Sequence, residues 1–245
     1  MTLAGTPGQE SADSEGREPK RKGARTRRRL LEASEQVFAD LGYHDASIVK
    51  ITEAAGVAQG TFYLYFAGKQ AIFDVLVEDL NRRIRHAMSA ASSRGRTRLE
   101  AERLGFEAFF RFTTEHPALY RIIRQAEFVS PQMLRLHYDR IAEGYIEGLQ
   151  RASDQGQIAI GDPEVTAWAL MAIGEMVGMR WILWSDTGEM PPEVFEQAMS
   201  VVAGVLGHGR QAPSAAPPAV APARSRSRSQ GSPAGSIDPH GTDDA

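Results

Sequence analysis

The sequence predicts an all-α protein, with an amino-terminal three-helix helix-turn-helix domain and a larger carboxy-terminal helical domain. Two observations carry this prediction. Between two polar ends, apolar residues recur at intervals of three and four, and no stretch alternates apolar and polar side chains for the length of a strand. Glycine or proline stands where many of these periodic runs begin or end, as is typical of helix boundaries.

The composition is that of a soluble globular protein. Of the 245 residues, 42% are hydrophobic and 24% are charged. No apolar run approaches the ~20 residues that a membrane span needs, and the amino terminus lacks the apolar segment of a secretory signal. The absence of cysteine excludes disulfide, thiolate and zinc-thiolate chemistry. We therefore expect a cytoplasmic protein that makes no membrane contact.

Both ends of the chain differ from the middle. Residues 1–19 and 209–245 are rich in Gly, Pro, Ser and Ala or in charge, and we expect both to be disordered because they bury too little apolar surface. The net charge of −3 hides a basic run, "KRKGARTRRR" at 20–29, which holds seven Lys or Arg and no acid. This run predicts contact with a polyanion, although a solvated arm remains the alternative.

Each helix is expected from its own boundary signals. Near the amino terminus, Gly42 ends the first periodic run, Ser47 caps a short helix that ends at Gly56, and a third segment covers 59–66. Ser130 and Asp162 each precede a proline and are expected to cap the helices that follow. The remaining helices are expected at 69–88, 98–115, 117–128, 131–155, 163–185 and from Pro191 to about Gly207.

The two short helices have the lengths and the glycine corner of a helix-turn-helix. Ile51, Ala55, Val57 and Phe62 are spaced to form the contact between them, so that Tyr63 and its outward neighbours face solvent. Hydroxyl and ammonium groups suit phosphate oxygens, and a glutamine can bind a base edge. Alternatively, the tyrosine rings only cover the next helix. The candidate DNA-binding residues are Arg25, Arg27, Ser47, Gln59, Gly60, Thr61, Tyr63, Tyr65 and Lys69.

The segment 25–72 resembles the DNA-binding region of the TetR family of bacterial transcriptional repressors. The resemblance rests on "LLEASEQVFADLGY", on "ITEAAGV", on "GTFYLYF" and on Lys69 at the start of the next helix. Two residues depart from the family pattern: Ala58 replaces a common hydroxyl cap, at a cost of ~1 kcal/mol, and Gln70 replaces an acid. Neither departure removes a DNA contact.

The resemblance implies the rest of the organisation. A basic arm and DNA-binding domain would span 20–68, a connecting helix and junction 69–96, and a ligand-binding and dimerisation domain 97–208. A homodimer would bind a palindromic operator in double-stranded DNA as a repressor that a small molecule releases. The last two helices are apolar nearly all round, and Gly174 and Gly178 permit close helix approach, although a buried helix pair within a monomer also fits.

The residues after 97 also suggest an effector. An apolar helical cavity with arginines at its mouth suits a long apolar molecule with an anionic end. Segments such as "AEFVSPQM" and "GMRWILW" are loosely similar to TetR-type regulators that sense acyl-coenzyme A, which makes an acyl-CoA the favoured ligand; a neutral aromatic compound with the arginines paired to surface acids is the alternative. The candidate ligand-binding residues are Phe109, Phe112, Arg121, Arg124, Phe128, His137, Tyr138, Tyr145, Met171, Glu175 and Trp181.

Two other functional classes were weighed. An architectural DNA-binding protein without effector would not need the long helical domain. An enzyme is not expected, because the six histidines show no metal-ligand spacing and the chain has no G-x-S-x-G elbow or phosphate-binding glycine loop. Glu175 on an apolar helix could be a perturbed acid, but a polar bond within a core or pocket is the commoner role. No cofactor and no metal are expected.

Overall fold

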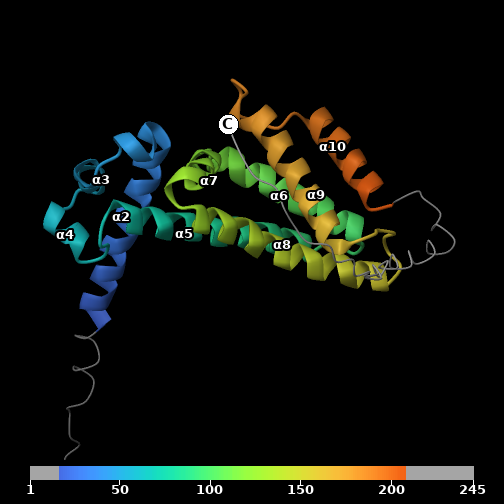
Figure 1. Ribbon diagram of the computed structural model, residues 1–245, viewed down its shortest axis with the longest axis horizontal. Coiled ribbons are helices and arrows are strands. Elements are labelled where there is room, and N and C mark those ends of the chain that lie inside the picture. The colour runs from blue at the N-terminus through green and yellow to red at the C-terminus, as the bar shows by residue number, and fades with distance from the viewer. Residues whose placement is uncertain (1–16, 208–245) are drawn as a thin grey trace, which may run out of the picture. The chain divides into compact units, whose positions relative to one another are not determined.

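The computed structural model describes residues 17–207, and within that range every regular element is a helix (Figure 1). The all-α class is therefore confirmed. The elements are α2 (Arg17–Asp45), α3 (Ile48–Ala55), α4 (Gln59–Tyr63), α5 (Lys69–Ser92), α6 (Arg98–Glu115), α7 (Ala118–Val129), α8 (Pro131–Asp154), α9 (Pro163–Gly178), the π-helix η1 (Met179–Leu183) and α10 (Pro192–Val205). No helix among residues 17–207 is both long and apolar enough to cross a membrane.

Most predicted helix boundaries are confirmed by their caps. The Ser47 hydroxyl accepts a hydrogen bond from the Lys50 amide at the start of α3, and Gly56 ends that helix with a φ of 61°. At the start of α9, the Asp162 carboxylate accepts hydrogen bonds from two backbone amides. Ser130 is a correction: its hydroxyl is buried without a hydrogen-bond partner, so α8 begins at Pro131 without a side-chain cap.

The structure corrects two boundaries near the amino terminus. Helix α2 begins at Arg17, so the basic run that we expected as an arm is helical, and the chain leaves helical geometry only at Gly42, whose φ is 75°. Helix α4 ends at Tyr63 rather than at Phe66, because the following backbone turns back on α4. Of the two segments expected to be disordered, residues 17–19 lie in α2, and 1–16 and 209–245 lie outside the described residues.

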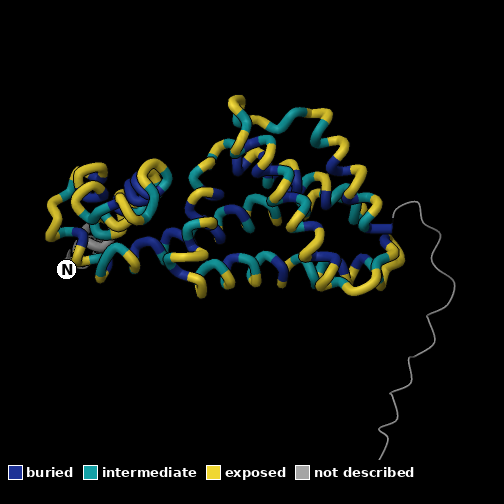
Figure 2. Tube along the Cα trace, turned by 45° about the horizontal axis from the view of Figure 1, so that its top comes forward, coloured by how far each residue is buried: buried dark blue, intermediate teal, exposed yellow. Residues whose placement is uncertain are grey.

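Two clusters of buried apolar side chains hold the helices together. Figure 2 colours the buried residues dark blue along the trace. The first runs from α2 through α3, α4 and α5 to α7 and includes Phe38, Phe62 and Phe73. The second joins α6, α8, α9 and α10 around Leu149 and Leu170. The first cluster continues across residues 68 and 69, so α3 and α4 share their core with α5 and α7. The predicted division into domains stays a prediction.

Candidate nucleic-acid interface and ligand pocket

Helices α3 and α4 form a braced pair. Ile51, Ala55 and Phe62 are buried in one apolar cluster, and Val57 packs against it from the turn between the helices. The predicted internal contact is therefore confirmed. The amide of Val57 donates to the Thr52 carbonyl at 3.0 Å and closes the turn. Because α4 is only five residues long, packing against α3 rather than intrinsic propensity fixes its position.

The outward face of α4 carries four of the candidate DNA-binding residues. Gln59, Gly60 and Tyr63 are exposed and Thr61 is half-buried. The Tyr63 side chain is 54% exposed, while its ring stands edge-on to the buried Phe62 ring at 5.5 Å. A methyl group at Gly60 would meet no atom within 4 Å, so another molecule can approach the backbone closely there. This face has the hydroxyl and amide groups that phosphate and base edges bind.

Lys69 does not lie free for a phosphate. Its ammonium donates to the carbonyls of Tyr43 and Ala46, at 2.7 and 2.9 Å, and lies 3.4 Å from the carbonyl of His44. It also lies 4.3 Å from the centre of the Tyr43 ring. An ammonium has three N–H groups, and all three are directed at the carboxy-terminal end of α2. The expected phosphate contact is corrected to a structural cap that ties α5 to α2.

Tyr65 is also corrected. It was expected to face outward with Tyr63, but it is half-buried against the first apolar cluster. Its hydroxyl lies 3.5 Å from where a methyl at Gly23 would stand, so the ring packs on α2. The helix ends at Tyr63, and the turn that follows sends Tyr65 inward. Of the two tyrosines, only Tyr63 presents its ring to solvent.

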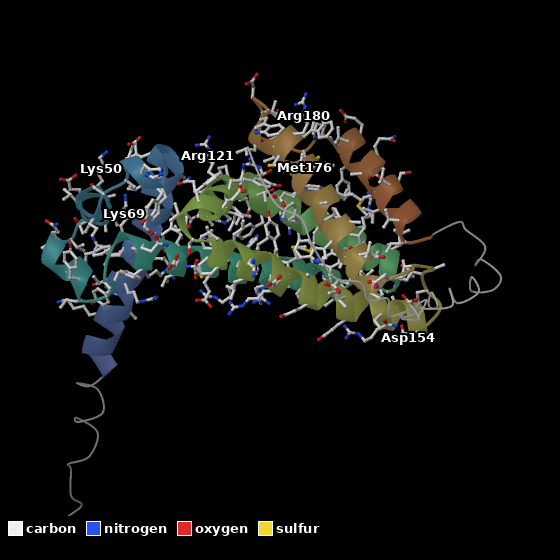
Figure 3. All side chains as sticks on the ribbon, in the orientation of Figure 1. Lys50, Lys69, Arg121, Asp154, Met176 and Arg180 are labelled. Carbon is white, nitrogen blue, oxygen red and sulfur yellow. The ribbon has the colours of Figure 1, made fainter. Side chains whose placement is uncertain are left out.

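The basic residues of α2 divide between two roles. Arg25 and Arg27 are exposed, and the Arg27 guanidinium lies 5.3 Å from the centre of the Phe66 ring. Arg29 instead donates to the Ala55 carbonyl and steadies the end of α3. Lys50, which the sequence reasoning missed, is exposed on α3, as Figure 3 shows, and donates to the Asp45 carbonyl at 3.1 Å. The spacing argument that placed Tyr63 on the outer side of α4 would also have placed Lys50 on the outer side of α3.

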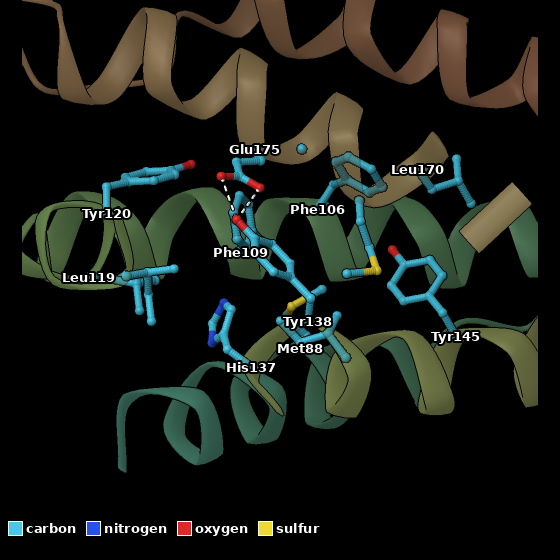
Figure 4. Close-up of a pocket in the computed structure, with 14 residues that line it drawn as sticks. Met88, Phe106, Phe109, Leu119, Tyr120, His137, Tyr138, Tyr145, Leu170 and Glu175 are labelled. Carbon is cyan, nitrogen blue, oxygen red and sulfur yellow. Dashed lines mark hydrogen bonds between the residues drawn. The ribbon is translucent and has the colours of Figure 1, made fainter. Parts of the chain in front are cut away.

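A cavity lies between α5, α6, α7, α8 and α9 (Figure 4). It has about 60 Å³ of space for the centre of a water-sized molecule, which is room for a few water molecules. Most of its wall is aromatic or aliphatic. The lining residues are Met88, Phe106, Phe109, Leu119, Tyr120, Ile123, His137, Tyr138, Ile141, Tyr145, Leu170, Met171, Gly174 and Glu175.

With this geometry in place, the chain can be compared with known proteins. Residues 30–76 match the family described as "Bacterial regulatory proteins, tetR family", and this range covers most of α2, all of α3 and α4, and the start of α5. This segment of the chain is therefore similar to the DNA-binding region of the TetR family. The match includes the buried contact between α3 and α4 and the exposed face of α4.

Curated relatives agree over the same region. The chain is 46% identical over 66 residues to the uncharacterized HTH-type transcriptional regulator YdgC of Bacillus subtilis, covering 27% of this chain and 34% of that protein. It is 33% identical over 112 residues to the HTH-type transcriptional activator FasR of Mycolicibacterium smegmatis, covering 44% and 49%. The chain therefore spans between a third and half of the length of these relatives.

A solved structure supports the fold over a longer stretch. The transcriptional regulator FadR of Bacillus subtilis, in complex with stearoyl-CoA, matches with a TM-score of 0.62 and 22% identity, covering 74% of this chain and 97% of that one. At this identity the likeness shows the fold alone. The likeness of fold extends beyond α3 and α4 to the helices that enclose the cavity.

The cavity contains six of the predicted ligand-binding residues. They are Phe109, His137, Tyr138, Tyr145, Met171 and Glu175. The sequence reasoning missed Met88, which the long apolar stripe of α5 could have indicated, and Tyr120.

The other five predicted residues lie outside the cavity and are corrections. Leu119, Tyr120 and Ile123 face the cavity, so the two arginines of α7 lie on its flank: Arg121 is exposed and donates to the Ala39 carbonyl at 3.2 Å, and Arg124 lies 3.4 Å from the Met179 sulfur. Neither arginine is among the residues that line the cavity. The remaining three are Phe112, buried in the first cluster; Phe128, 83% exposed; and Trp181, half-buried in the π-helix.

Several polar groups interrupt the apolar wall. The Tyr138 hydroxyl donates to the Glu175 carboxylate, at 2.8 and 2.9 Å from its two oxygens, as the dashed lines in Figure 4 show. Burial and the neighbouring Glu175 charge raise the pKa of Tyr138, so it stays a donor at neutral pH. The Tyr120 hydroxyl is buried without a hydrogen-bond partner. A cavity with a carboxylate and an unsatisfied hydroxyl favours a ligand whose buried part is neutral.

His137 is held in one tautomer. The Arg85 guanidinium donates to the Asn81 side-chain oxygen at 3.0 Å, so the Asn81 amide nitrogen faces His137. That nitrogen lies 3.1 Å from His137 Nδ1 and 2.9 Å from its carbonyl oxygen. Nδ1 therefore accepts, and the neutral ring carries its proton on Nε2. Burial, and to a smaller extent the charge of Arg85, lowers the pKa of His137 to about 4.

At the opposite end of the cavity, Tyr145 belongs to a buried polar group. Its hydroxyl donates to Glu102 at 2.9 Å, and Arg98 forms an ion pair with the same carboxylate. Burial raises the pKa of Glu102, while Arg98 and Tyr145 oppose that shift. Burial and the Glu102 charge raise the pKa of Tyr145. Among residues 17–207, no group of three or more His, Asp or Glu side chains is arranged so that it could hold a metal ion.

The glycines of α9 face inward rather than toward another molecule. A methyl at Gly174 would lie 3.4 Å from the Phe106 ring, and one at Gly178 would lie 1.9 Å from the Tyr120 hydroxyl. We expected these glycines to permit close approach between helices. The helices that approach α9 at these positions are α6 and α7 of the same chain. The outer side of α9 instead carries an exposed apolar stripe of Val165, Trp168 and Met176, the last of which Figure 3 labels.

Proposed function

We propose that this chain is a homodimeric transcriptional regulator whose affinity for a palindromic operator depends on an apolar effector bound in the cavity. The position of α7 carries the proposal. One face of α7 lines the cavity with Leu119, Tyr120 and Ile123. Its other face bonds to α2, where the Gln125 side-chain oxygen accepts from the Tyr43 amide at 2.6 Å. A ligand that moves α7 therefore acts on the helix that packs against α3.

The exposed stripe on α9 supports dimerisation. Val165, Trp168 and Met176 lie at spacings of three and eight, which places them on one side of the helix, with exposures of 68%, 41% and 55%. Val201 on the adjoining α10 is 55% exposed. Exposed apolar side chains gathered on neighbouring helices are typical of an interface. Because the two DNA-binding surfaces of a dimer are related by two-fold symmetry, the operator would be palindromic with half-sites ~34–36 Å apart.

An acyl-CoA thioester is the effector class that we favour. The cavity wall is apolar, as an acyl chain requires, and a structural neighbour is described in complex with stearoyl-CoA. The cavity is far smaller than such a chain, so binding requires the wall to open. The arginines that first suggested an anionic end lie outside the cavity, which favours a neutral aromatic compound as the second candidate. Repression is the expected mode, although the relative FasR is named an activator.

The test combines operator binding with effector release. DNA fragments retained by the purified protein would be sequenced, and the recovered site labelled for fluorescence anisotropy. Stearoyl-CoA, stearate and free coenzyme A would then be added in turn. Release by the thioester supports the effector assignment, and release by neutral aromatic compounds alone supports the second candidate. Failure to retain any DNA sequence would refute the regulator itself.

A further inference from the structure

A second hollow adjoins the cavity on the side formed by α5, α6 and α8. It has about 390 Å³ of space for the centre of a water-sized molecule, several times that of the cavity. Met88, Ile141 and Tyr145 line both, so these residues form the partition between them. We name this hollow the arginine groove. Its other lining residues are Arg85, Ser89, Ser92, Ser93, Arg98, Ala101, Glu102, Arg140, Gly144, Gly148 and Arg151.

The chemistry of the arginine groove is opposite to that of the cavity. Four arginines and three serines line it, with Glu102 as the only acid in the lining. That carboxylate is already engaged, because it accepts from Arg98 and from Tyr145. Guanidinium and hydroxyl groups supply N–H and O–H donors, and arginine in particular binds phosphate oxygens in pairs. The lining therefore matches a phosphate-bearing group.

The arginines differ in how firmly they are held. Arg140 pairs with Glu78 at 2.9 Å and Arg151 with Glu147 at 3.5 Å, and all four side chains are at least one-third exposed. Exposed pairs of this kind are weak, so a phosphate can replace the carboxylate at small cost. Within residues 17–207, Arg85 bonds to no carboxylate; its hydrogen bond goes to the neutral Asn81 amide, which in turn bonds His137 in the cavity wall.

Glycine keeps the groove open. Gly144 and Gly148 stand one turn apart on the side of α8 that lines it. A methyl at Gly148 would collide with the Arg98 guanidinium, so this glycine admits Arg98. A methyl at Gly144 would meet no atom within 4 Å. Glycine inside a helix costs about 0.5–1 kcal/mol relative to alanine, and at Gly144 no packing within the chain accounts for that cost.

We propose that the arginine groove binds the phosphate-bearing head of an amphiphilic effector whose apolar chain lies in the adjoining cavity. This inference rests on the proposed function and names the part of the effector that the cavity itself cannot hold. Arg85 and Arg140 pair with phosphate, the three serines add donors, and the effector crosses the partition at Met88 and Tyr145. Coenzyme A and a phospholipid are two sources of this chemistry.

The experiment measures direct binding of four probes to the full chain by calorimetry. Stearoyl-CoA carries both parts, stearoyl-pantetheine has the same thioester without phosphate, and free coenzyme A has no chain. Stearoyl lysophosphatidate places a single phosphate on a lipid. We expect stearoyl-CoA to bind at least tenfold more tightly than stearoyl-pantetheine, and Arg85→Gln to remove most of that difference. Gly144→Leu, which fills the groove, should have the same effect.

Matched variants separate the groove from general effects. Arg111→Gln changes an exposed arginine of α6 outside the groove and should leave all affinities unchanged. Gly144→Ala controls for the backbone change. Arg85-dependent binding of lysophosphatidate at the strength of stearoyl-CoA would identify a lipid phosphate as the source and support the groove. Free coenzyme A that binds as tightly as stearoyl-CoA would overturn the continuous site.

Failure of this inference and failure of the proposed function give different results. Equal affinities for stearoyl-CoA and stearoyl-pantetheine, with operator release by both, would overturn the arginine groove and leave the regulator intact. Operator binding that no probe affects, with tight Arg85-dependent binding of stearoyl-CoA, would support the groove and refute effector control. Absence of binding by every probe would overturn both the groove and the acyl effector.

Discussion

Gly178 and Gly144 offer a paired test of the packing around the cavity. Both lie in helices with helical backbone geometry, so alanine at either position gains about 0.5–1 kcal/mol of helix propensity. Their surroundings differ. The methyl of Gly178→Ala would stand 1.9 Å from the Tyr120 hydroxyl and 3.0 Å from its ring, whereas that of Gly144→Ala would meet no atom within 4 Å.

The expected changes therefore have opposite signs. Forcing a methyl into a packed core costs about 1–3 kcal/mol, and the buried Tyr120 side chain would have to shift to admit it. After the propensity gain is subtracted, Gly178→Ala should lose about 1 kcal/mol of stability, which lowers the melting temperature by about 2–4 °C. Gly144→Ala should raise it by about 1–3 °C.

Tyr120→Phe provides the control within the same contact. It removes the hydroxyl that the new methyl would strike, and that hydroxyl is buried without a partner, so its loss alone should cost little. The double variant should recover most of the stability that Gly178→Ala loses, as a double-mutant cycle would show. Melting curves at one fixed protein concentration give all four values. Equal stabilisation by both alanines would refute this account of the packing.

Three further predictions concern other contacts. Lys69→Met should lower stability by about 1.5–3 kcal/mol in urea unfolding, because it removes charge-assisted bonds to the end of α2, and an unchanged unfolding midpoint would refute the cap. Since the pKa of His137 is lowered to about 4 in the folded chain from its usual 6.5, stability should fall by roughly 3 kcal/mol as the pH drops from 6.5 to 4, and His137→Gln should flatten that profile. Tyr63→Ala should weaken DNA binding in anisotropy without changing the melting temperature, whereas Tyr65→Ala should lower the melting temperature; the reverse pattern would contradict their placement.

The fold could be predicted from the sequence because its signals are local. A cap such as Asp162, the left-handed Gly56 and the 3.6-residue period act within a few positions of the chain, and each element they predict is present. The contact between α3 and α4 depends on spacing over a dozen residues, which periodicity also reaches. Prediction failed where a contact depends on a second element. The ammonium of Lys69 is a group that can bind phosphate, yet in the structure it donates to a carbonyl at the end of α2.

The pocket shows the same limit. Residues that face the cavity could be found when they were aromatic or polar on an apolar helix, as Tyr138 and Glu175 were. The prediction for the two arginines of α7 was wrong because the direction in which they point depends on which face of α7 packs against α6 and α9. The sequence of α7 alone does not specify that face. The arginine groove is formed by α5, α6 and α8, which are distant in sequence, so no local pattern marks it. The one local sign of the groove is Gly144, a glycine within a helix at which an added methyl would meet no atom within 4 Å.

Helix α7 connects the cavity to α2, so an effector in the cavity could act through it on the DNA-binding region. A ligand shifts a conformational equilibrium only by the difference in its affinity for the two states. With about 60 Å³ of space, the cavity holds no acyl chain as it stands, so a binding-competent state has its wall displaced. Displacing α7 strains its bonds to α2, which run from Gln125 to the Tyr43 amide and from Arg121 to the Ala39 carbonyl. Lys69 ties that same end of α2 to α5, and the first apolar cluster joins α2 to α3 and α4. Under the proposed function, the small cavity and the shared core are the two features that would make operator affinity depend on what the cavity contains.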